Sequence, residues 1–325
     1  MRAARRGGYG SIVVHKRRLI YGSSMFDRVP CPSDDASAAP FLAPWSAVGE
    51  GASDRFWLLA LGAELNAVTG IVTGRHRQIP LDLLLDRLAL RAARRGSWLE
   101  GRTVTDAELR DLLAFTPPDA SPGLDGALHR FWRRLVTIDL GTPGGAADVR
   151  DAVGLLADPE QDPIAGLAGG IASVQSAHDR LEARALAAGD VALSLSLGFP
   201  RVVPLVALVA TPEHLRLSAP GVCAAAPDLL LKAIPDVIAL AGDLVQRAAR
   251  IEAARPKLRA KARDAVVAAF LAHDVLAPSV HLSPRVAGSN QPLSDRAARR
   301  ICDRLVDLGA VHELTGRATF RVYGL

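Results

Sequence analysis

Five arginine side chains near the carboxyl end of the chain have the spacing to bind the phosphates of a nucleic acid. Arg296, Arg299 and Arg300 lie in the first two turns of an amphipathic segment, and Arg317 and Arg321 lie at the tip and on the outer face of the wing expected after it. Guanidinium groups bind phosphates and base edges through paired hydrogen bonds, so this arrangement predicts contact with duplex DNA. The alternatives are a solvated helix face and a surface that docks another protein.

The segments that must position these arginines have the element order of a winged helix. A helix is expected over residues 258–276, a short helix over 283–287, and a second long helix after the capping residue Ser294. Residues 310–314 and 318–323 predict a hairpin, with Phe320 and Val322 on one face of its second strand. In helix-turn-helix proteins the last helix enters the major groove, which would bring its arginines to the bases.

The rest of the chain has the apolar spacing of helices, without the alternation of strands and helices that builds a parallel sheet. Helices are expected near residues 53–68, 80–95, 105–113, 124–138, 147–157, 164–197 and 227–254. Thr105 and Glu108 form a capping box at the start of the third of these helices, and the sixth is expected to break near Gly169 and Gly170. The predicted fold class is therefore mainly α: a multi-helical body followed by a C-terminal winged helix-turn-helix with a short β-hairpin.

The distribution of charge suggests four regions within the 325 residues, whose formal net charge is +5. Residues 1–24 hold six basic residues and no acidic one, and we expect this basic leader to precede a natural start at Met25; a phosphate-binding arm is the alternative. Residues 25–52 are expected to be an extended lead-in. Residues 53–255 form an acidic helical domain within a −6 region that begins at Met25, and residues 256–325 form a basic winged-helix domain of net charge +5.

Several classes of protein are disfavoured by the absence of their motifs. The three cysteines lie far apart and cannot build the disulfide scaffold of a small secreted protein, so a cytoplasmic protein is expected. Prolines interrupt the apolar run near residues 202–210, so no membrane partner is expected. Phosphate-loop, hydrolase and zinc motifs are missing, and we expect no cofactor, no metal and no catalytic residues. His178 and Glu182 could together bind a metal, but without a third ligand a surface pair is favoured; an enzyme site near them or near His214 is the weakest hypothesis.

Two parts of the chain carry a resemblance to a known family: Leu197-Gly198-Phe199-Pro200 with Pro204-Leu205, and the C-terminal stretches Ser294–Arg300, Leu308–Val311, Glu313–Arg317 and Phe320–Leu325. The sequence resembles an uncharacterised bacterial family, domain of unknown function fourteen-zero-three, which is typical of alphaproteobacteria and often carried on plasmids. The resemblance covers about Phe41 to Leu325 and brings no established catalytic or binding residues.

Together, these features lead us to expect a non-enzymatic DNA-binding protein that serves plasmid maintenance or transcriptional regulation. The alternative is a scaffold subunit whose winged helix docks a protein partner of a DNA-associated complex.

Overall fold

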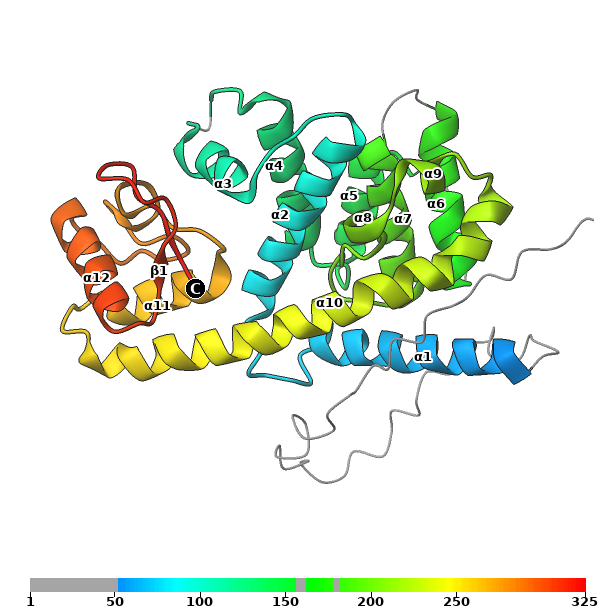
Figure 1. Ribbon diagram of the computed structural model, residues 1–325. Helices are drawn as coiled ribbons and strands as arrows, with labels where there is room; N and C mark the ends of the chain where they lie inside the picture. Colours follow the sequence, from blue (N-terminus) through cyan, green and yellow to red (C-terminus); the bar gives the residue numbers. More distant parts are fainter. Residues whose placement is uncertain (1–51, 118, 156–161, 178–181) are drawn as a thin grey trace, which may run out of the picture. The chain divides into compact units, whose positions relative to one another are not determined.

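The computed structural model describes residues 52–117, 119–155, 162–177 and 182–325, all of which belong to one compact unit (Figure 1). The leader, most of the lead-in and His178 lie outside these residues. The body is built from α1 (Ala52–Val72), α2 (Leu81–Leu99), α3 (Asp106–Phe115), α4 (Gly123–Thr137), α5 (Pro143–Val153), α6 (Pro163–Ala177), α7 (Glu182–Ser196), α8 (Val206–Val209), α9 (Pro212–Leu215) and α10 (Ala219–Ala254). The mainly α-helical fold expected from the apolar periodicity is confirmed.

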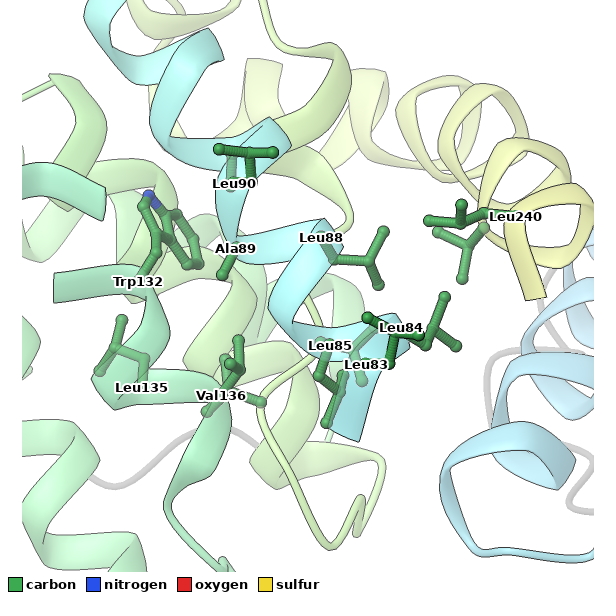
Figure 2. Packing of buried hydrophobic residues seen from close by; sticks show 14 of the residues in the cluster. Leu83, Leu84, Leu85, Leu88, Ala89, Leu90, Trp132, Leu135, Val136 and Leu240 are labelled. Carbon is green, nitrogen blue, oxygen red and sulfur yellow. The ribbon is translucent and has the colours of Figure 1, made fainter. Parts of the chain in front are cut away.

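Helix α2 lies at the centre of the body's hydrophobic core. Leu83, Leu84 and Leu88 are fully buried, and they lie among side chains from other helices, such as Trp132 of α4 and Leu240 of α10 (Figure 2). Helices α4, α8 and α11 all pack against α2. Burial of such large side chains contributes about 1.5–3 kcal/mol each, so this helix is a main source of the body's stability.

Helix α10 is the longest of the described elements, and both α1 and α6 pack against it (Figure 1). The sequence predicts a start at Pro227, but the helix begins eight residues earlier and continues through Pro227 and Pro235. Proline removes one hydrogen bond from a helix interior. The extra turns persist because they bury Val222 and Ala226 against the core. Packing therefore overrides the local preference for a break.

The expected break near Gly169 and Gly170 is wrong, because both residues lie inside α6. A Cβ atom on Gly170 would lie 2.6 Å from the carbonyl oxygen of Ala188 in α7, whereas one on Gly169 would meet nothing within 4 Å. The absence of a side chain at Gly170 thus lets the backbones of α6 and α7 approach closely. A glycine that looks like a helix breaker in the sequence is a packing residue in the fold.

The C-terminal segment has the expected order of helix, short helix, helix and hairpin. Its elements are η2 (Arg255–Lys257), α11 (Arg263–Ala272), the single turn η3 (Pro278–Leu282), α12 (Asp295–Asp307), β1 (His312–Glu313) and β2 (Tyr323–Gly324). The short helix lies before residues 283–287 rather than at them. The antiparallel hairpin is small, and it pairs His312 with Gly324 and Glu313 with Tyr323.

The expected alternation of faces in the second strand is wrong. Phe320 is 69% exposed and has a positive φ of 54°, which lies outside the β region of backbone conformations. Val322 and Tyr323, which are adjacent in the chain, are both buried, and the Tyr323 backbone also forms a bridge with Leu276. The strand has a backbone partner on each edge and is buried on both faces, in place of the half-buried pattern that the sequence suggests.

In the part of the chain that the structure describes, no helix has both the length and the apolar character needed to cross a bilayer. The apolar run at residues 202–210 is instead buried in the body, where it contains the short helix α8.

Candidate nucleic-acid interface

Helix α12 separates an apolar face from a basic one. Its buried side chains are Ala298, Ile301, Cys302 and Leu305, and its outward arginines are Arg296, Arg299, Arg300 and Arg304. The hydroxyl of Ser294 caps the helix by accepting a hydrogen bond from the Ala297 amide at 3.4 Å. The sequence therefore predicts this helix correctly, from its cap to its buried stripe.

Three of the five predicted DNA-binding arginines are ion-paired within the fold. The pairs are Arg299 with Asp295 at 2.7 Å, Arg317 with Asp111 at 2.6 Å, and Arg321 with Asp303 at 3.8 Å. Arg296 and Arg300 are exposed and have no ion pair with any described residue. Because a carboxylate beside an arginine offsets its attraction for phosphate, Arg296 and Arg300 are the better placed of the five.

Arg300 lies in a basic groove of about 580 Å³ that the sequence did not reveal. The groove is lined by Lys257, Leu258, Arg259, Ala260, Ala297, Arg300, Ile301 and Arg304. Its four cationic side chains are all exposed, and none forms an ion pair with a described residue. No carboxylate lines the groove, so its positive potential is not cancelled locally. We call this feature the α12 groove.

Three of the four cations, Lys257, Arg259 and Arg304, were missed in the sequence. A signal for Arg304 was present, since it lies four residues after Arg300 and therefore on the same helix face. For Lys257 and Arg259 there was no such signal, because they lie before α11 and reach α12 only in the folded chain.

A buried ion cluster attaches the C-terminal segment to the body. The Asp274 carboxylate accepts hydrogen bonds from Arg87 Nε at 2.8 Å and Arg110 Nε at 2.6 Å, and its backbone amide donates to Asp86 at 2.9 Å. Arg87 also donates to the carbonyl oxygen of Leu325. Burial alone would raise the pKa of Asp274, but the hydrogen bonds and charges of Arg110 and Arg87 outweigh it and hold the pKa below its ordinary value.

The histidine hypotheses have little geometric support. His214 Nδ1 lies 2.6 Å from the Thr211 hydroxyl and accepts from the Thr211 amide at 3.2 Å, so this ring caps the start of α9. His178 lies outside the described residues. Within residues 52–117, 119–155, 162–177 and 182–325, no three histidine, cysteine or carboxylate side chains gather as metal ligands.

Comparison with known proteins identifies a family. The model of a family described as "Protein of unknown function (DUF1403)" matches residues 31–168 and 161–325. The chain therefore belongs to this family, as the resemblance in the sequence indicated. No curated protein and no solved structure matches the chain.

Proposed function

We propose that this member of the DUF1403 family is a non-enzymatic protein that binds duplex DNA through its C-terminal segment, which acts as a winged helix-turn-helix. The observation that carries the proposal is the α12 groove, where four cations with no ion pair to a described residue lie along one exposed helix face. DNA binding of this kind would serve plasmid maintenance or transcriptional regulation.

The order of elements supports this use of α12. Helix α12 follows α11 and η3, and a hairpin follows α12 in turn. This is the order of elements in DNA-binding domains of the winged-helix type. Its outward face is basic from Arg296 to Arg304, over about two and a half turns, so it can contact both backbone phosphates and base edges. Lys257 and Arg259 extend the same positive surface away from the helix and would contact phosphates.

The proposal is tested by measuring binding of the full chain to a short mixed-sequence duplex over a salt series. Each phosphate neutralised adds about −0.9 to the slope of log K against log salt concentration. Replacing Arg300 and Arg304 by alanine should therefore make the slope less steep by about 2 units and weaken binding. The control is Arg134→Ala on α4, an exposed arginine outside the α12 groove, which should leave the slope unchanged.

Two results would refute DNA binding through the α12 groove. One is the absence of salt-sensitive binding by the wild-type chain. The other is an unchanged slope in the Arg300/Arg304 double variant, since the α12 groove would then contribute no phosphate contacts.

Docking of a protein partner is the second candidate, and one observation favours it. The Phe320 ring is 69% exposed and borders a hollow of about 430 Å³ with Pro278 and Arg321. A large exposed aromatic ring beside a hollow is typical of protein interfaces. A partner lost with Phe320→Ser, in a variant that still binds duplex DNA like the wild type, would assign this face to protein rather than to DNA.

A further inference from the structure

A second basic hollow, of about 830 Å³, lies on the body of the protein. It is lined by residues of α2, of α3 and the segment between these two helices, and of α8 and α10, among them five arginines, Trp98 and two aspartates, Asp106 and Asp236. We call it the α2 hollow. Its volume lies within the range of small-molecule binding sites, about 300–1,000 Å³.

The five arginines of the α2 hollow differ in how they are neutralised. Arg94 lies 3.0 Å from Asp106, as an ion pair without hydrogen-bond geometry, while Arg102 pairs with Asp125 at 2.7 Å and Arg110 with Asp274 at 2.6 Å. Arg91 and Arg95 have no carboxylate partner among the described residues. These two guanidinium groups can therefore take an anion without first breaking an ion pair.

Arg95 and Trp98 form a pre-organised platform within the α2 hollow. Arg95 Nε donates to the carbonyl oxygen of Ala210 at 2.8 Å, and its Nη2 donates to that of Val209 at 3.3 Å. Its guanidinium carbon lies 4.2 Å from the centroid of the Trp98 ring, which is itself 48% exposed. Burial and the neighbouring charge of Arg94 lower the pKa of Arg95, as expected where cations gather with too little counter-charge.

We propose that the α2 hollow binds a nucleotide, with its phosphates at Arg91 and its base against Trp98. A site for a bare polyanion would not include the carboxylate of Asp236, which has no ion pair with a described residue and would repel such a ligand. A nucleotide uses all three chemistries: arginines for phosphate, an aromatic ring for stacking, and a carboxylate that accepts from ribose hydroxyls or base amino groups.

The proposal is tested by calorimetric titration of the full chain with three probes: ATP, a short oligothymidylate and inorganic triphosphate. Arg91→Ala should weaken binding of every probe at least about 10-fold, because it removes charge-assisted hydrogen bonds to phosphate. Trp98→Ala should weaken the binding of ATP or of oligothymidylate to a similar extent and should leave the binding of triphosphate unchanged. Arg250→Ala on the exposed face of α10 removes the same charge outside the hollow and should change nothing.

The two nucleotide probes identify the source of the ligand. Binding of ATP alone indicates a free nucleotide, and binding of the oligonucleotide alone indicates a single strand. The proposal is overturned if neither binds the wild-type chain at about 1 mM, if Arg91→Ala and Arg250→Ala behave alike, or if Trp98→Ala weakens triphosphate as much as ATP. The Arg300/Arg304 double variant should bind these probes normally, so failure here is distinct from failure of duplex binding at α12.

Discussion

Asp274→Asn tests whether the buried ion cluster holds the C-terminal segment on the body. The Asp274 side chain is 5% exposed and accepts from Arg87 Nε at 2.8 Å, Arg110 Nε at 2.6 Å and Arg110 Nη2 at 3.2 Å. Asparagine keeps the shape but removes the charge, and its amide nitrogen cannot accept a hydrogen bond from either arginine. Two largely buried guanidinium groups are then left without a counter-ion, which destabilises a protein by about 3–5 kcal/mol.

Urea unfolding followed by circular dichroism measures this loss. With a slope of about 3 kcal/mol per molar urea, the midpoint should fall by about 1–1.7 M. The control is Asp264→Asn, since Asp264 is 66% exposed and lies 3.7 Å from Arg263, and it should cost less than about 1 kcal/mol. If Asp274→Asn costs no more than this control, the cluster does not hold the segment in place and the reasoning is wrong.

The same carboxylate gives a pH signature with a defined sign. Its pKa in the fold lies below the ordinary value, so the unfolded chain takes up its proton first as the pH falls. Its stabilising contribution is therefore present above about pH 4 and is lost as the pH falls further. Asp274→Asn should lose less stability than the wild type over that acid range, and equal losses would contradict the assignment.

Three further substitutions test the helical body. Gly170→Ala should destabilise by about 1–3 kcal/mol in urea unfolding, because its Cβ would meet the Ala188 carbonyl oxygen at 2.6 Å. Gly169→Ala, with open space around its Cβ, should stabilise by about 0.5–1 kcal/mol, and the same sign for both would refute the close approach of α6 and α7. Complete burial raises the pKa of Asp190 to about 7. The backbone amides of Ala207, Val206 and Leu205 donate hydrogen bonds to the carboxylate and lower the pKa, but by less than burial raises it. Stability should then fall as the pH rises from about 4 to 7, by up to about 1.4 kcal/mol per unit, and Asp190→Asn should remove that slope.

The sequence alone was sufficient for features that depend on residues within about one helical turn of each other. The capping box of Thr105 and Glu108 is present, with the Thr105 hydroxyl accepting from the Glu108 amide at 3.2 Å and the Glu108 carboxylate accepting from the Thr105 amide at 2.8 Å. The buried stripe of α12 and its Ser294 cap are also as expected. Such features are visible in a sequence because caps and apolar periodicity act between residues three or four apart.

The tertiary structure decided which charges are free and which are neutralised. Arg317 pairs with Asp111 across 206 residues, and Arg87 with Asp274 across 187, so no local pattern could assign either pair. The net charge of a region did not show where free arginines gather either, because residues 25–255, whose net charge is −6, contain the arginine-lined α2 hollow. The sequence determined which segments form the long helices, though not all of their ends, and how many arginines they carry. Only the fold, by bringing distant carboxylates to some arginines and not to others, determined which of them remain available to bind a phosphate.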